Sequence, residues 1–161
     1  MSFKIRQVKE EEFIELASLS LKCPPMVTER NSIYHIFTKF FNNTSLVAEE
    51  ESGNIIAFLL GFISQVNPGE AYIHLLCVDP RFRRNKIASM LIEKFTDLVS
   101  IRGCRKMFLI TGPENRTAQK LYKKMGFEAV KNDKTMEIKG ISVVKDYNGP
   151  GDHKVLFYRD I

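Results

Sequence analysis

The sequence contains no apolar run long enough to span a membrane, which excludes a membrane-spanning helix. Met1–Arg6 lack the apolar core of a signal peptide, so export is not expected. There are only three cysteines, and their spacing fits no metal-ligand pattern. This small, odd number predicts no disulfide framework, no metal site and a reducing, cytoplasmic location. Repeats, low-complexity segments and linkers are also missing.

The composition is that of an ordinary globular protein. The chain has 161 residues, of which 44% are hydrophobic and 27% charged. This length suits one substantial core, so we expect a single domain over residues 1–161. Lysine and arginine exceed aspartate and glutamate, which gives a net charge of +5. A mild positive excess fits an anionic small ligand and also fits nucleic acid.

The most informative stretch runs from Val78 to Leu91. The preceding residues 71–78 are apolar and β-branched, as in a strand, and Asp79-Pro80 ends them. From Ile87 onward apolar residues recur at helical spacing. Four cations, Arg81, Arg83, Arg84 and Lys86, fill the loop between the two elements. Cations repel the positive end of a helix dipole, so this pattern favours a bound anion such as a pyrophosphate.

The remaining periodicities predict an α/β fold. Helices are expected around residues 13–20, 33–41 and 87–99 and after Asn115. Strands are expected at residues 3–9, 44–50, 55–65, 72–78, 107–111, 141–144 and 154–158. A first half rich in hairpins and a second half of alternating strands and helices indicate a sheet of mixed direction. We predict about six or seven strands flanked by about four helices.

Two motifs in this order resemble the GNAT superfamily of N-acetyltransferases. Residues 78–91 fit V-x-P-x-x-R-x-x-x-I-A-x-x-L, which is similar to motif A of that superfamily. Residues 115–127 fit N-x-x-A-x-x-L-Y-x-x-x-G-F, which is similar to motif B. The resemblance is specific over residues 71–130 and implies the GNAT-like fold for the whole chain.

Motif A departs from the family pattern at one position. The family core Q/R-x-x-G-x-G/A falls on Arg83, Lys86 and Ala88, so a lysine replaces the first glycine. Glycine lets a backbone approach a phosphate closely. If Lys86 lies in the first helical turn, it needs only helical dihedral angles and the loop can still bind a phosphate; the alternative is a weaker hold on the cofactor.

The resemblance implies acetyl-CoA as cosubstrate and direct transfer of its acetyl group to a primary amine. The implied cofactor-binding residues are Leu76, Cys77, Val78, Arg83, Arg84, Asn85, Lys86, Ile87, Ala88, Ser89, Asn115, Ala118 and Tyr122. Tyr122 matches the family tyrosine that gives a proton or hydrogen bond to the coenzyme A sulfur. A phenol is protonated at neutral pH and suits that role.

The base that accepts the amine proton is predicted to be His74. Strand alternation places Tyr72, His74, Leu76 and Val78 on one face, with Cys77 on the opposite face as a small buried hydrophobe. Several superfamily members carry a histidine or glutamate at the position of His74, and an imidazole titrates in a suitable range. Glu70 and a water molecule remain alternatives.

The leading hypothesis is that the protein is a small-molecule N-acetyltransferase acting on an amino acid, amino sugar or polyamine. Alternatives are a protein lysine or N-terminal acetyltransferase, and a non-catalytic module that binds acyl-CoA or nucleic acid. Tyr122 argues against the non-catalytic module. We therefore expect the protein to bind a small amine and to bind neither nucleic acid nor membrane. Whether it forms a homodimer stays open.

Overall fold

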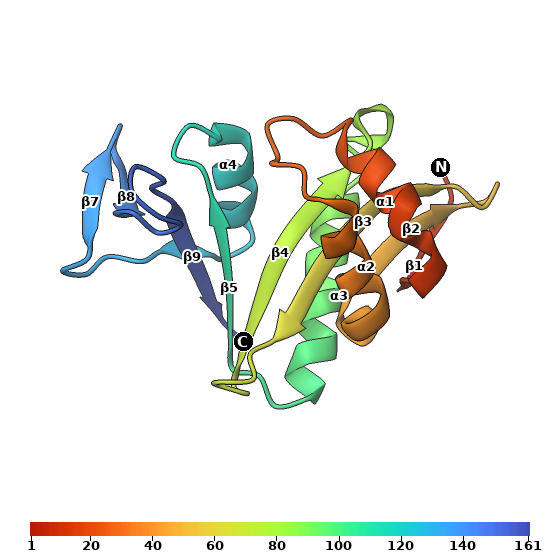
Figure 1. Ribbon diagram of the computed structural model, residues 1–161, viewed down its shortest axis with the longest axis horizontal. Helices are drawn as coiled ribbons and strands as arrows, with labels where there is room; N and C mark the ends of the chain where they lie inside the picture. Colours follow the sequence, from red (N-terminus) through yellow and green to blue (C-terminus); the bar gives the residue numbers. More distant parts are fainter. The chain divides into compact units, whose positions relative to one another are not determined.

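The chain has the predicted α/β fold class, as a computed structural model of all 161 residues shows (Figure 1). Seven strands belong to the sheets described below, two further strands form a hairpin, and there are four α-helices. These numbers confirm the prediction of six or seven strands and four helices. Two compact units, Met1–Cys104 and Arg105–Ile161, are described one at a time below. The single-domain organisation stays a prediction.

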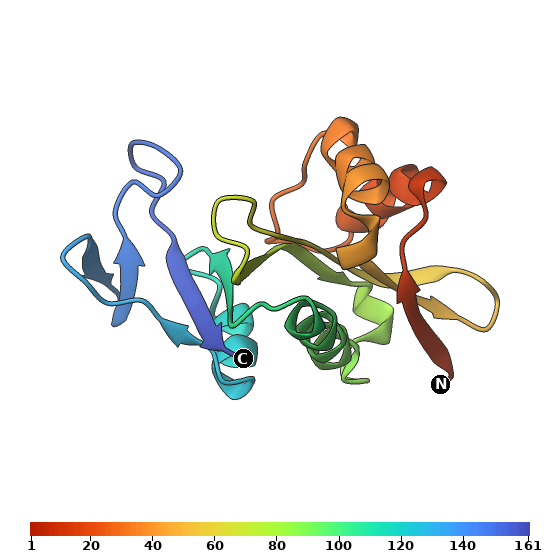
Figure 2. The same cartoon turned by 90° about the horizontal axis from the view of Figure 1, so that it is seen from below.

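The sheet of the first unit is antiparallel. Its strands, in spatial order, are β1 (Phe3–Gln7), β2 (Leu46–Glu50), β3 (Ile55–Ile63) and β4 (Glu70–Val78). The apolar run of β3 is buried from Ile55 to Gly61, because helices cover both faces of this sheet (Figure 2). A strand covered on both sides gains by being apolar at every position.

The helices of this unit lie on opposite faces of the sheet (Figure 2). One face carries α1 (Phe13–Ser20) and α2 (Asn31–Phe40), and the other carries α3 (Ile87–Ile101). Three short 3-10 helices, η1 (Glu10–Glu12), η2 (Asn42–Thr44) and η3 (Pro80–Phe82), connect these elements. The core under α1 and α2 includes the fully buried Tyr34 and Phe58. No helix in the chain is both long enough and apolar enough to cross a bilayer.

A bulge at His74 interrupts the pairing of β3 with β4. Leu60 lies opposite Leu75, but Gly61 lies opposite Ile73, so His74 has no partner residue on β3. Such an extra residue reverses the alternation of side chains along the rest of the strand.

The bulge changes which side chains share a face. Leu75 and Cys77 belong to the core under α1 and α2. Tyr72, beyond the bulge, lies opposite Phe62, which packs against the same core. The ring of His74 stacks on Phe37 of α2. The prediction that His74 shares a face with Leu76 and Val78, opposite to Cys77, is therefore wrong.

The second unit contains a three-stranded antiparallel sheet in the order β5 (Lys106–Thr111), β9 (Val155–Asp160) and β6 (Glu128–Ala129). Helix α4 (Arg116–Lys124) follows β5, and β7 (Thr135–Ile138) pairs with β8 (Ile141–Val144). The strands at 107–111 and 141–144 were predicted within a residue. The short β6 and β7 were not: β6 has only two residues, and the alternation of Met136 and Ile138 with polar residues in β7 was missed.

Candidate functional site

The loop after β4 begins at a buried carboxylate. Asp79 is 2% exposed and accepts a hydrogen bond of 3.0 Å from the backbone N–H of Arg81. The Arg81 guanidinium also donates to Asp79, at 2.8 Å for the shorter contact, and it lowers the pKa of that carboxyl to about 2. Arg81 therefore holds the start of the loop through Asp79, and the Asp79 carboxylate neutralises its charge.

The loop continues through two residues with left-handed backbone conformation. Arg84 has φ of 67° and Lys86 has φ of 59°. Lys86 is the N-cap of α3 and does not lie in its first turn, so the condition under which it would need only helical dihedral angles is not met. Left-handed geometry costs a side chain with a Cβ roughly 1–2 kcal/mol, which explains why glycine suits this position. The side chain of Asn85 donates to the carbonyl of Phe82 at 2.9 Å and helps to hold the loop.

This loop has the features of an anion-binding site. Helix α3 starts at Ile87, so the N–H groups of Ile87, Ala88 and Ser89 have no partner within the helix. No acidic residue lies in its first turn. Three neighbouring cations, Arg83, Arg84 and Lys86, form no ion pair with a carboxylate. Unpaired N–H groups next to unpaired cations favour a bound anion.

The Lys86→Gly variant is expected to stabilise the protein without ligand by about 1 kcal/mol, because glycine adopts left-handed angles freely. Its affinity for acetyl-CoA should fall because a cation is lost, and the fall should be larger at low ionic strength. Thermal unfolding and isothermal titration measure the two effects separately. Lys86→Ala is the matched control: it loses the same charge but keeps a Cβ, and so should not gain stability. Equal stability of the two variants would contradict the backbone argument.

The predicted base His74 has a carboxylate neighbour that sequence reasoning missed. Nε2 of His74 lies 3.0 Å from Oε1 of Glu29, and both side chains are about 70% covered, with exposures of 28% and 29%. On one side, the His74 ring stacks on Phe37 at 5.2 Å between centroids and 3° between planes. Glu70, the alternative base, is the first residue of β4. Glu29 lies 45 positions from His74 in the sequence, and no local signal connects the two.

Cys77 is bonded to Cys23, which corrects the prediction of no disulfide. The two cysteines are 54 positions apart, and both side chains are buried. Cys23 follows α1, and the bulge at His74 turns Cys77 towards that same helix. The cytoplasmic location, which relied partly on free cysteines, loses this support. Cys104 remains a buried free thiol.

Tyr122 and Asn115 lie on and before α4 in the second unit. The side chain of Asn115 accepts a hydrogen bond of 3.2 Å from the N–H of Ala118, which confirms its predicted capping role. Tyr122 packs against Phe127 and Phe157, with ring centroids 6.0 and 5.7 Å away. Burial raises the pKa of the Tyr122 phenol to about 12. The phenol therefore keeps its proton throughout the pH range of ordinary enzyme assays.

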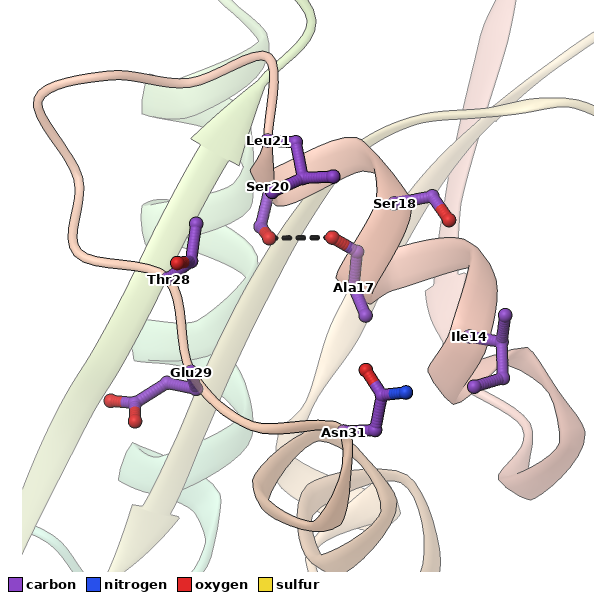
Figure 3. A pocket seen from close by; sticks show the side chains of 8 residues that line it. All are labelled: Ile14, Ala17, Ser18, Ser20, Leu21, Thr28, Glu29 and Asn31. Atoms are coloured by element: carbon purple, nitrogen blue, oxygen red, sulfur yellow. Dashed lines mark hydrogen bonds between the residues drawn. The ribbon is translucent and has the colours of Figure 1, made fainter.

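A small pocket of about 200 Å³ lies between α1 and the segment that precedes α2 (Figure 3). It is lined by Ile14, Ala17, Ser18, Ser20, Leu21, Thr28, Glu29 and Asn31. Figure 3 shows the carboxylate of Glu29 pointing away from the other residues that line this pocket. None of the predicted cofactor or catalytic residues lines the pocket.

Comparison with known proteins finds acetyltransferases. The L-2,4-diaminobutyric acid acetyltransferase of Chromohalobacter salexigens is 22% identical over 75% of this chain and 63% of its own length. The human N-alpha-acetyltransferase 30 is 30% identical over 76% of this chain and 35% of its own length. The chain thus matches less than two thirds of the length of either curated relative.

The fold also matches solved structures. The diaminobutyrate acetyltransferase EctA from Paenibacillus lautus, solved with L-2,4-diaminobutyric acid and coenzyme A, superposes with a TM-score of 0.78. The two proteins are 19% identical, and the match covers 98% of this chain and 93% of that one. A sequence model of the acetyltransferase (GNAT) family matches residues 13–127, which include both motifs. This chain therefore belongs to the GNAT family of acetyltransferases.

Proposed function

We propose that this protein is an acetyl-CoA-dependent N-acetyltransferase that acetylates the primary amine of a small molecule. The observation that carries the proposal is the half-buried His74, which is held by Glu29 and stacked on Phe37. Amine acetylation requires removal of a proton from the nucleophile, and a neutral imidazole can accept it. The relatedness to a diaminobutyric acid acetyltransferase supports a small amine as acceptor.

The other residues take separate roles in this proposal. Acetyl-CoA supplies the acetyl group as a thioester. Arg83, Arg84 and the first N–H groups of α3 hold its pyrophosphate. The backbone of Leu76–Val78 binds the pantetheine arm and polarises the thioester carbonyl. Tyr122 holds the proton that the departing thiolate needs.

A second candidate is acetylation of a protein N-terminus. The relative that favours it is the human N-alpha-acetyltransferase 30, which at 30% has a higher identity than the diaminobutyric acid enzyme. Both candidates use the same acetyl donor and need the same removal of an amine proton. They differ in the acceptor: a peptide acceptor continues well beyond its amino group, whereas a small amine does not.

Acetyl-CoA is expected to stabilise the protein by roughly 2.7 kcal/mol at a hundredfold excess over its dissociation constant. For a chain of this size, that corresponds to a rise in Tm of roughly 5–11 °C. Differential scanning fluorimetry checks the shift, with duplex DNA as the control anion. DNA should give no comparable shift, and any DNA binding should weaken steeply with salt. If millimolar acetyl-CoA leaves the Tm unchanged, the assignment of acetyl-CoA as cosubstrate is refuted.

The proposed function is tested by measuring thiol release from acetyl-CoA with panels of amines. One panel contains diamino acids, amino sugars and polyamines, and the other contains short peptides with free N-termini. Mass spectrometry identifies the acetylated product. We expect turnover with the small amines. Turnover confined to the peptides would replace the proposal with the second candidate.

A further inference from the structure

The contact between Glu29 and His74 has a chemical consequence for the proposed reaction. An ionised carboxylate has only acceptor atoms, so the imidazole nitrogen that faces it must carry a proton. The nitrogen that faces Glu29 is Nε2, at 3.0 Å from Oε1. In the neutral imidazole, the proton therefore sits on Nε2, and Nδ1 keeps a free lone pair.

We propose that Glu29 is a positioning residue that fixes this tautomer of His74 and so prepares Nδ1 to take the proton of the acceptor amine. The inference rests on the proposed function, which assigns the proton transfer to His74. In the step, an N–H bond of the acceptor breaks and an Nδ1–H bond forms. The acceptor nitrogen keeps the electron pair with which it attacks. The positive charge gained by the imidazole lies next to the Glu29 carboxylate.

The fold holds Glu29 in place from two directions. Its backbone N–H donates to the hydroxyl of the fully buried Tyr34 at 3.4 Å. Six positions earlier, Cys23 anchors the same segment to β4 through the disulfide with Cys77. Because these two contacts already restrict the segment, it loses little further conformational freedom when the Glu29 carboxylate contacts His74. Glu29 is therefore preorganised for this contact.

The imidazole is also held by ring packing. Phe37 lies parallel to it, and Tyr72 lies at 6.1 Å between centroids on its own strand. Because His74 is the bulged residue of β4, its side chain meets α2, from which Phe37 comes. Stacking fixes the plane of the ring, and the Glu29 carboxylate then decides which of its two nitrogens carries the proton.

The chain contains a matched control for this arrangement. His35 on α2 has the same contact, with Nε2 at 3.0 Å from Oε1 of Glu10, and its ring stacks on Phe13 at 4.4 Å. This second pair is more exposed, at 42% and 47%, and lies outside the candidate site. Glu10→Gln therefore removes a similar charge from a similar pair without touching His74.

The test combines nitrogen NMR with kinetics. The protein has three histidines, so a ¹⁵N-histidine spectrum is simple, and His74→Gln assigns the signal of interest. We expect His74 of the unchanged protein to be protonated at Nε2 when neutral. In Glu29→Gln this preference should be lost, because an amide can donate as well as accept. The kcat of that variant should fall on the order of 100-fold with an unchanged KM for acetyl-CoA.

Glu10→Gln should change neither the His74 signal nor kcat. An unchanged His74 tautomer in Glu29→Gln would overturn the proposal, and so would a changed tautomer with an unchanged kcat. Absence of turnover with every amine in the unchanged protein would instead refute the proposed function. The NMR measurement would still decide whether Glu29 sets the tautomer.

Discussion

Tyr122→Phe is expected to lower kcat by about 100- to 10,000-fold, the usual contribution of general acid catalysis. The hydroxyl acts in our proposal on the thiolate that forms during the reaction, so affinity for acetyl-CoA should hardly change. Phenylalanine keeps the ring contacts with Phe127 and Phe157, and the fold should therefore be retained. Because burial raises the pKa of Tyr122 to about 12, its ionisation should not limit kcat below roughly pH 11.

The measurement is single-turnover thiol release, which reports the chemical step directly. Tyr158→Phe is the matched control in the same unit: its hydroxyl donates to Glu128 at 2.9 Å and has no role in the proposed reaction. Only the Tyr122 variant should lose activity. An unchanged single-turnover rate for Tyr122→Phe would remove this residue from the mechanism.

Reduction of the Cys23–Cys77 disulfide is expected to lower the free energy of unfolding by about 4 kcal/mol. The bond joins residues 54 positions apart, and closing a loop of that length removes about this much chain entropy from the unfolded state. The corresponding fall in Tm is roughly 8–16 °C. Thermal unfolding with and without a phosphine reductant measures the change.

Three variants and a thiol count make this result specific. Cys23→Ser and Cys77→Ser should each unfold at a temperature that no longer depends on the reductant. Cys104→Ala should keep the dependence, because Cys104 is not in the bond. In guanidinium, the oxidised protein should expose one reactive thiol and the reduced protein three. Three thiols before reduction would show that the bond does not form in solution.

The features that the sequence predicted correctly depend on near neighbours along the chain. The strand, loop and helix of residues 71–101 follow from a proline, a run of apolar residues and a helical repeat. Asn115 caps α4 through an N–H only three residues away. Family resemblance added predicted roles for residues such as Tyr122, because both motifs lie in continuous stretches, and these roles stay predictions.

The features that the sequence could not predict depend on partners far away in the chain. The bulge at His74 exists only in the register between β3 and β4. Glu29 and Cys23 reach β4 from a segment without regular structure, and no spacing rule connects them with His74 and Cys77. The conformation of Lys86 is a local feature that the sequence left open, since a lysine gives no sign that its backbone is left-handed.

The bulge in β4 also determines how the acceptor preference of this protein could be redesigned. A library that randomises alternate residues of β4 would normally change one face of the sheet. Here it would change both, because the alternation reverses at His74. The positions that face α1 and α2 are Tyr72, His74, Leu75 and Cys77. Since His74 is the proposed base and Cys77 is in the disulfide, a directed-evolution experiment should vary Tyr72 and Leu75 together and leave the α3 side of the strand unchanged.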